Sequence, residues 1–196
     1  MMKRILIALL FVFSCIGAMA QNANEHLKFM GIPINGTLES FTQKLVAKGM
    51  KRQQGWDNTG VFRGTFAGEC DCKVFVNRIL SRNIVYRIVV CLPSRNMWEW
   101  LESDYKQFKQ MLTSKYGEPK FCSESFKEGA STYDNSSKMI ATLSGKCNYL
   151  ASWPIDGGVI DLEIFKPDGE FYCCVRLQYF DRINYKLAQD SKQDDL

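Results

Sequence analysis

The order of the periodic segments along the chain constrains the fold more than any other feature of the sequence. One amphipathic segment begins after Thr37, a suitable N-cap, and runs to about Lys48, where Gly49 ends it. A second begins after Asn96, which can form a capping box with Glu99. Its apolar side chains recur at helical spacing and predict one buried stripe: Met97, Leu101, Tyr105, Phe108 and Leu112.

Alternating apolar and polar segments fill the spaces between the two predicted helices, a pattern typical of antiparallel strands. Those that follow the first helix span residues 50–54, 61–66, 70–79 and 84–92. Those that follow the second span residues 120–126, a stretch ending at 147–153, 159–165 and 170–180. The sequence therefore predicts an α+β fold of two tandem helix-plus-antiparallel-sheet units. Each unit is a helix followed by about four strands, in two layers with one sheet face left open.

Small sequence marks recur in both halves and place the predicted domain boundaries. Ile32-Pro33 precedes the first helix, and Leu92-Pro93 precedes the second. We interpret this as an internal duplication, with the first unit at residues 21–93 and the second at 94–185. Residues 186–196 are polar and predict a flexible tail.

Residues 1–20 have the pattern of an export signal peptide. A basic start, Lys3-Arg4, precedes an apolar run that ends with the cleavage pattern Ala18-Met19-Ala20. The run is shorter than the roughly 20 residues that a transmembrane helix needs. We therefore expect cleavage before Gln21 and export to the bacterial periplasm or the medium, with no transmembrane segment in the mature chain. Lipid attachment at Cys15 is the alternative, and a bulky phenylalanine two positions earlier argues against it.

The charge balance argues against one class of partner. The whole chain carries a net charge of +4, and removal of Lys3 and Arg4 with the leader lowers it to +2. Nucleic-acid binding needs a concentrated basic face that neutralises phosphates, and so small an excess does not supply one. We therefore expect no nucleic-acid partner.

The cysteines fit an oxidising compartment, in which disulfides are the default expectation. Removal of Cys15 leaves seven of the 8 cysteines, so at least one has no partner within the chain. A hairpin formed by the strands at either side of residues 80–83 would place Cys72 opposite Cys91, close enough for a bridge. Cys122 with Cys147 is the second predicted bridge.

Neither a metal site nor a catalytic constellation is predicted. Cys70-Asp71-Cys72 has one residue between its cysteines, whereas zinc sites usually have at least two. The chain has a single histidine, His26. A Cys–His dyad or a serine triad would have to use it, and nothing in the sequence places it beside a cysteine or serine nucleophile. The sequence has neither a G-x-S-x-G motif nor a phosphate-binding glycine loop. We therefore expect no catalytic residues, no metal and no cofactor.

One pair of carboxylates keeps an enzymatic alternative open. Asp161 and Glu163 lie two residues apart in a predicted strand, so they share a face, as the acid and base of a hydrolase would. The other interpretation is the solvent side of a half-buried strand, with Asp161 roughly opposite Arg176. We favour the second interpretation because paired surface charges are common.

The strand at 84–92 is apolar on both sides, and this indicates a binding surface. If the helices cover one face only, the other face exposes apolar and aromatic side chains or meets a partner. The candidate contacts are of types enriched in binding hot spots: Phe75, Tyr86, Tyr172, Arg176 and Phe180. The alternative is that the chain itself buries both faces, because apolar strands are usually core.

Two tandem units of helix plus antiparallel sheet, in an exported chain of this size, resemble the fold of the beta-lactamase inhibitor protein. In that family the two sheets form a concave surface that grips a partner enzyme. Four segments are also similar to uncharacterised exported proteins of gut bacteria: residues 30–36, 146–149, 179–184 and 194–196. These resemblances imply a bacterial exported protein, whereas a likeness of fold alone does not define an activity.

The function expected from the sequence is therefore non-enzymatic binding of a protein partner through an open sheet face. Inhibition of an envelope enzyme and neutralisation of a rival's toxin, as an immunity protein, both fit this expectation. Two alternatives come from other classes, namely a periplasmic hydrolase that uses Asp161 and Glu163 and a structural component of the envelope.

Overall fold

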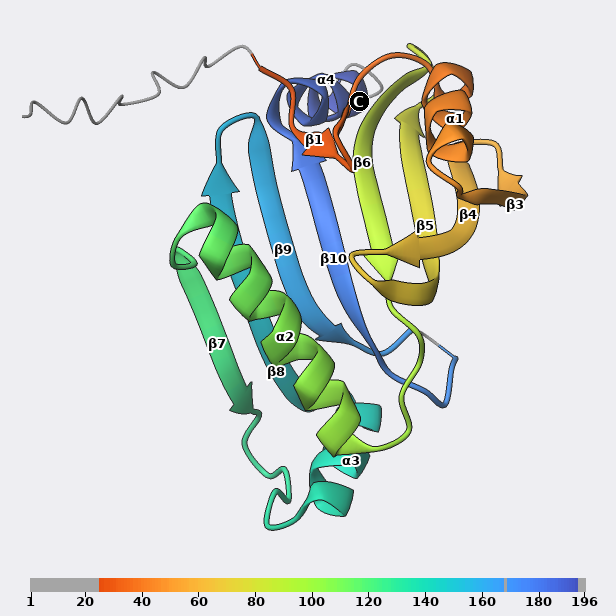
Figure 1. The fold of residues 1–196 in the computed structure, drawn as a ribbon. Helices are drawn as coiled ribbons and strands as arrows, with labels where there is room; N and C mark the ends of the chain where they lie inside the picture. The colour runs from red at the N-terminus through yellow and green to blue at the C-terminus, as the bar shows by residue number, and fades with distance from the viewer. Residues whose placement is uncertain (1–24, 168, 194–196) are drawn as a thin grey trace, which may run out of the picture.

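The computed structural model describes residues 25–167 and 169–193. The predicted leader at 1–20, with Cys15, and the final residues 194–196 lie outside the described residues. The described chain contains these elements in order (Figure 1): β1 (Lys28–Phe29), β2 (Ile32–Pro33), α1 (Leu38–Ala47), β3 (Lys51–Trp56), β4 (Thr59–Phe66), β5 (Glu69–Ile79), β6 (Ile84–Cys91), α2 (Trp98–Tyr116), β7 (Phe121–Phe126), α3 (Asn135–Leu143), β8 (Cys147–Ile155), β9 (Gly158–Phe165), β10 (Cys174–Asp181) and α4 (Arg182–Gln193).

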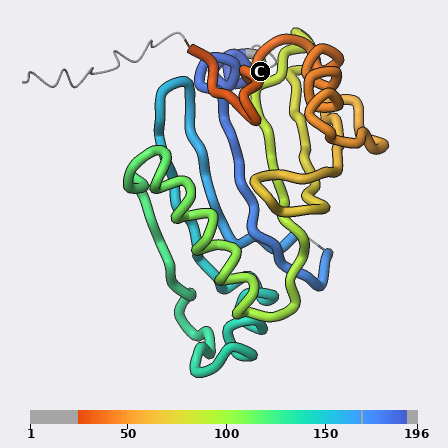
Figure 2. Tube along the Cα trace, in the orientation of Figure 1, coloured from red at the N-terminus to blue at the C-terminus, as the bar shows by residue number. Residues whose placement is uncertain are grey.

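Strands β3 to β10 form one antiparallel sheet in the order β3-β4-β5-β6-β10-β9-β8-β7, and β1 and β2 form a separate hairpin. The two meanders, β3–β6 and β7–β10, meet where β6 pairs with β10. This pairing runs from Cys91 opposite Arg176 to Arg87 opposite Phe180. The prediction of two tandem helix-plus-sheet units is therefore wrong, because a single sheet runs through both halves of the chain (Figure 2).

The character of β6 and β10 explains why the sheet is continuous. Val89 and Val90 of β6 are both buried although they point to opposite faces, and the same holds for Cys174 and Val175 of β10. In two separate sheets each of these strands would be an edge with unpaired backbone N–H and C=O groups. Joining the edges pairs those groups and places these two strands at the centre of the sheet.

One face of the sheet is covered by α1, α2 and the β1-β2 hairpin, which lie in front of it in Figure 1. The strand side chains on this face form the core together with the helices: Phe62, Val74, Val76, Ile88, Val90, Leu162, Val175 and Leu177. The ring of Phe66 contacts Phe29 of the hairpin at 5.4 Å and Phe108 of α2 at 6.2 Å between centroids. The predicted stripe of α2 is confirmed for its four helical members, which are buried: Leu101, Tyr105, Phe108 and Leu112. It is wrong for Met97, which precedes the helix and is 47% exposed.

The two predicted helix caps differ in outcome. The Thr37 side chain accepts a hydrogen bond from the backbone N–H of Ser40 at 3.2 Å, which confirms it as the N-cap of α1. The predicted capping box of Asn96 and Glu99 is wrong, because α2 begins at Trp98 and its N-cap, Met97, makes no side-chain bond. Glu99 instead accepts a hydrogen bond from Asn135 of α3.

Two helices were not predicted, and one of them replaces the predicted tail. Helix α3 is capped by Asp134, whose carboxylate accepts a hydrogen bond from the backbone N–H of Ser137 at 2.7 Å. The chain from Lys186, expected to be a flexible tail, is helical as far as Gln193 in α4. Asn184 anchors α4 by donating hydrogen bonds to the carbonyl oxygens of Ile34 at 3.0 Å and Val85 at 2.9 Å. These bonds tie α4 to the chain before α1 and to β6.

A β-bulge changes the register of the β5–β6 hairpin. Ile79 does lie opposite Ile84, but the pairing shifts between Asn77 and Arg78, so that Lys73 lies opposite Cys91. Cys72 therefore points to the helix-covered face and Cys91 to the other face, which makes the predicted Cys72–Cys91 pairing wrong. The sequence pattern cannot show this bulge, because one extra residue leaves the apolar character of both strands unchanged.

The second predicted disulfide also lacks the required geometry. Cys122 lies opposite Ala151, and Cys147 lies opposite Phe126 at the other end of the β7–β8 pair. Four residues of strand separate them, about 13 Å at the usual rise, whereas bridged cysteines have Cα atoms within about 7 Å. The cysteines of the described chain are all free thiols. In the same part of the chain no helix is both long and apolar enough to cross a membrane.

Candidate functional site

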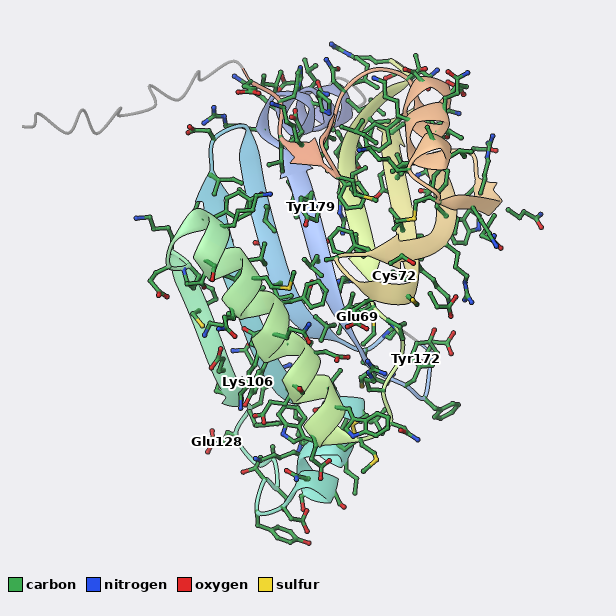
Figure 3. All side chains as sticks on the ribbon, in the orientation of Figure 1. Glu69, Cys72, Lys106, Glu128, Tyr172 and Tyr179 are labelled. Atoms are coloured by element: carbon green, nitrogen blue, oxygen red, sulfur yellow. The ribbon has the colours of Figure 1, made fainter. Side chains whose placement is uncertain are left out.

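A hollow of about 570 Å³ lies on the face of the sheet that α1 and α2 leave uncovered. Its floor comes from β4, β5, β6 and β10, and its walls come from residues 92–94 and the connection between β9 and β10. The lining includes aromatic, basic and thiol side chains: Trp56, Arg63, Asp71, Lys73, Phe75, Arg87, Cys91, Phe165, Tyr172, Cys174 and Arg176. Figure 3 places Tyr172 in the β9–β10 connection, at the end of the sheet away from α4. A hollow of this size is typical of binding sites.

Three of the five predicted contact residues line this hollow. Phe75, Tyr172 and Arg176 do so, whereas Tyr86 and Phe180 do not. The ring of Tyr185 of α4 contacts Tyr86 at 6.2 Å and Phe180 at 5.3 Å between centroids. Helix α4 therefore covers one end of the open face and leaves the other end open. The sequence left two alternatives, a face exposed for a partner and a face buried by the chain itself, and each holds at one end.

Basic side chains outnumber acidic ones in the lining, which holds Arg63, Lys73, Arg87 and Arg176 but only Asp71. Arg63 is paired with Asp71, at 2.9 Å between Nη1 and Oδ1. In the described chain Lys73 forms no ion pair. The sequence analysis missed Arg63, Lys73 and Arg87, which come from three neighbouring strands. Arg63 lies opposite Lys73, two residues from Phe75, and Arg87 lies opposite Asn77, so all three share the face of Phe75.

Arg176 is held in place by β9. Its guanidinium donates to the Glu163 carboxylate, with Nε 2.8 Å from Oε1, and lies over the Phe165 ring at 3.3 Å from the centroid. The stacked ring, together with the contacts of Nε and Nη2 to the same Glu163 oxygen, fixes the planar group at the edge of the hollow. Glu163 thus neutralises the charge of Arg176, as Asp71 neutralises that of Arg63. The unneutralised positive charge of the hollow therefore lies on Lys73 and Arg87.

Arg87 is the most unusual of the basic residues. Its guanidinium lies over the Phe180 ring at 5.0 Å and donates to Gln178, yet its Nε is buried without a hydrogen-bond partner. Burial lowers the pKa of Arg87 because it removes water from the charged group. A buried donor without an acceptor destabilises the free protein by about 1–3 kcal/mol, and an incoming acceptor would remove that penalty.

The carboxylates of the enzymatic alternative lie beside the hollow and do not line it. Asp161 lies opposite Gln178, and the residue opposite Arg176 is Glu163, so the predicted register is two residues off. Asp161 accepts a hydrogen bond from Ser152 at 2.6 Å, and burial raises the pKa of its carboxyl group. Both carboxylates have hydrogen-bond donors within the chain, which is what a structural role requires.

The single histidine belongs to a different part of the molecule. His26 Nδ1 lies 3.0 Å from Asp181, a fully buried carboxylate that also accepts the backbone N–H of Leu27 and of Asn184. Asp181 thus joins the beginning of the described chain to the first turn of α4. No group of three or more potential metal-ligating side chains occurs in residues 25–167 and 169–193.

Comparison of the chain with protein-family models, with curated proteins and with solved structures gave no match.

Proposed function

We propose that this chain is an exported, non-enzymatic binding protein that holds a protein partner at the hollow of the open sheet face. The partner presents a carboxylate between apolar or aromatic side chains. The observation that carries the proposal is the unneutralised positive charge of Lys73 and Arg87 in the lining of the hollow, with the Arg87 Nε buried and unpaired.

Charge complementarity supports a carboxylate as the central group. A carboxylate accepts several hydrogen bonds at once, so acidic groups of a partner suit the ammonium group of Lys73 and the guanidinium group of Arg87. Phe75 and Tyr172 supply apolar walls around this charge. An anion surrounded by aromatic surface is the combination expected of an acidic side chain with apolar neighbours.

The rim supports a macromolecule over a small molecule. Trp56 at the hollow is 68% exposed, and Phe171, next to Tyr172, is 93% exposed. Aromatic side chains this exposed are enriched at the centres of protein interfaces, where a partner buries them. A ligand confined to the hollow leaves Phe171 in water, whereas a protein partner covers it. Inhibition of an enzyme or neutralisation of a toxin would follow if the covered partner surface contains its active site.

The test starts with capture of partners by the tagged mature chain from envelope and secreted proteins, followed by titration calorimetry with the purified partner. Lys73→Glu reverses an unpaired charge and Trp56→Ala removes the exposed ring, and each should raise Kd at least tenfold. Tyr133→Ala is the matched control, since Tyr133 is also a highly exposed aromatic residue but lies outside the hollow, in the β7–α3 connection.

A captured protein whose Kd is the same for Lys73→Glu, Trp56→Ala and the wild type contradicts the proposed face. Equal weakening by Tyr133→Ala contradicts it too, because the effect would then be non-specific. A partner whose acidic residues can all be replaced by amides without loss of affinity contradicts the proposed chemistry.

A further inference from the structure

We propose that Cys91 and Cys174 form a thiol–disulfide exchange site in the hollow, where a small-molecule disulfide is reduced and the two cysteines become linked across β6 and β10. This inference does not rest on the proposed partner binding. It concerns the chemistry of two thiols that the sequence analysis assigned to other partners or to none.

The sheet register brings the two thiols together. Cys91 lies opposite Arg176, and Cys174 precedes Arg176 by two residues, so it lies on the same face as the diagonal neighbour of Cys91. The backbone N–H of Leu92 donates to Val175 at 3.0 Å and holds the strands together between the two positions. The side chains of Cys91 and Cys174 both line the hollow.

The two thiols differ in access and in acidity. Cys91 is half-buried and faces the hollow, whereas Cys174 is 2% exposed. The neighbouring Cys174 thiol lowers the pKa of Cys91, and Arg176 and Lys73 lower it further, against the effect of burial. The neighbouring Cys91 thiol and burial raise the pKa of Cys174. An accessible thiol of lowered pKa beside a buried one of raised pKa suits attack by the first and resolution by the second.

The exchange balances in two steps. The Cys91 thiolate attacks one sulfur of a disulfide RSSR, forms a mixed disulfide Cys91–S–SR, and releases RS⁻, which takes up the proton that Cys91 lost. The Cys174 sulfur then attacks the Cys91 sulfur, forms the Cys91–Cys174 bond, and releases the second RS⁻, which takes the Cys174 proton. The two cysteine sulfurs lose two electrons in all, and RSSR is reduced to two RSH.

Four further cysteines do not line the hollow: Cys70, Cys72, Cys122 and Cys173. Cys72 and Cys173 face the helix-covered side, and burial raises the pKa of each thiol to about 11. Cys173 is adjacent to Cys174 in the chain but lies on the opposite face, so it makes a matched control. Cys70 and Cys122 are exposed, and their sulfurs contact Thr65 and Glu124.

The test uses the reduced mature chain, oxidised glutathione as the disulfide, alkylation of the remaining thiols, and non-reducing tryptic mass spectrometry. Trypsin places Cys91 in the peptide 88–95, whereas Cys147, Cys173 and Cys174 share the peptide 147–176. We expect one linked species of these two peptides, removable by a reductant. It should be absent from Cys91→Ser and Cys174→Ala and fully retained in Cys173→Ala.

A trapping variant separates the two steps. In Cys174→Ala the resolving thiol is missing, so Cys91 should accumulate as the mixed disulfide with glutathione. In Cys91→Ser neither product should form at Cys174. Recovery of the wild-type peptide 88–95 only as alkylated Cys91, or a linked species that persists in Cys174→Ala but not in Cys173→Ala, overturns the proposal. Circular dichroism of each variant verifies that it is folded.

Discussion

The two ends of the open sheet face differ in what covers their aromatic side chains. At one end Tyr86 and Phe180 contact Tyr185 of α4, and at the other end Phe75 and Tyr172 line a hollow. The residues at both ends are one phenylalanine and one tyrosine, so their chemistry alone does not decide between core and binding surface. What distinguishes the two ends is α4, which covers only the end nearest to its anchoring residue, Asn184. A binding surface on such a sheet is therefore the part that the chain's own helix does not reach.

The largest expected effect comes from removal of the anchor of α4. Asn184→Ala leaves the buried carbonyl oxygens of Ile34 and Val85 without their donor, and Asn184 itself is only 2% exposed. We expect a loss of about 3 kcal/mol in the free energy of unfolding, because each unsatisfied buried group costs about 1–3 kcal/mol. Urea unfolding measures it. Asn135→Ala, which removes an exposed bond to Glu99, should cost less than about 0.5 kcal/mol, and equal losses would show that α4 is not anchored as described.

The next effect tests whether the covered end is core. Tyr185→Ala removes the ring that contacts Tyr86 and Phe180, and it should lower the free energy of unfolding by about 1–2 kcal/mol. The same variant should bind the protein partner with unchanged Kd, since Tyr185 does not line the hollow. Tyr86→Ala should behave in the same way. A tenfold weaker complex for either variant would mean that the partner reaches the end covered by α4.

The sequence predicted the local elements of this fold much better than their assembly. Alternation and caps depend on near neighbours in the chain, and this is why the strands and the stripe of α2 were found. The joining of β6 to β10 depends on two edges about ninety residues apart, and no local pattern encodes which edges meet. The bulge at Asn77 and Arg78 shifted one register and with it the predicted faces of Cys72 and Cys91.

The candidate site was predicted in part for the same reason. Phe75, Tyr172 and Arg176 were found because aromatic and arginine side chains on an apolar sheet indicate a contact surface at either end of it. Tyr86 and Phe180 were chosen by the same rule, and only the position of α4 distinguishes them. Helix α4 itself has a polar sequence with few apolar residues, which is the pattern that predicted a flexible tail from Lys186 onwards.

Arg87 lies where the two ends meet and should respond differently in stability and in binding. Arg87→Met keeps the length of the side chain over Phe180 but removes the buried charge and its unpaired Nε. Removal of an unsatisfied buried donor offsets the lost cation–π contact, so we expect the free energy of unfolding to stay within about 1 kcal/mol of the wild type. The Kd for the partner should rise about tenfold, measured by calorimetry. A large loss of stability with unchanged Kd would make Arg87 a structural residue only.

The smallest effect concerns the pH dependence of stability through Asp161. Burial raises the pKa of its carboxyl group above the value of about 3.9 expected in the unfolded chain, and Glu163 raises it further, against the hydrogen bond from Ser152. The folded state therefore binds the proton more tightly, so the wild type loses stability as the pH rises from about 3.9 through the raised folded value. Asp161→Asn keeps a hydrogen-bond acceptor for Ser152 without the charge. Its melting temperature should exceed that of the wild type at pH 7, and the difference should shrink towards zero at pH 3.

Asp190→Asn, at an exposed position of α4, reports the effect of removing one negative charge elsewhere and should not reproduce this difference. A melting temperature of Asp161→Asn below the wild type at pH 7 would show that the Asp161 charge stabilises this part of the face. Charged groups would then stabilise the open face outside the hollow as well as within it.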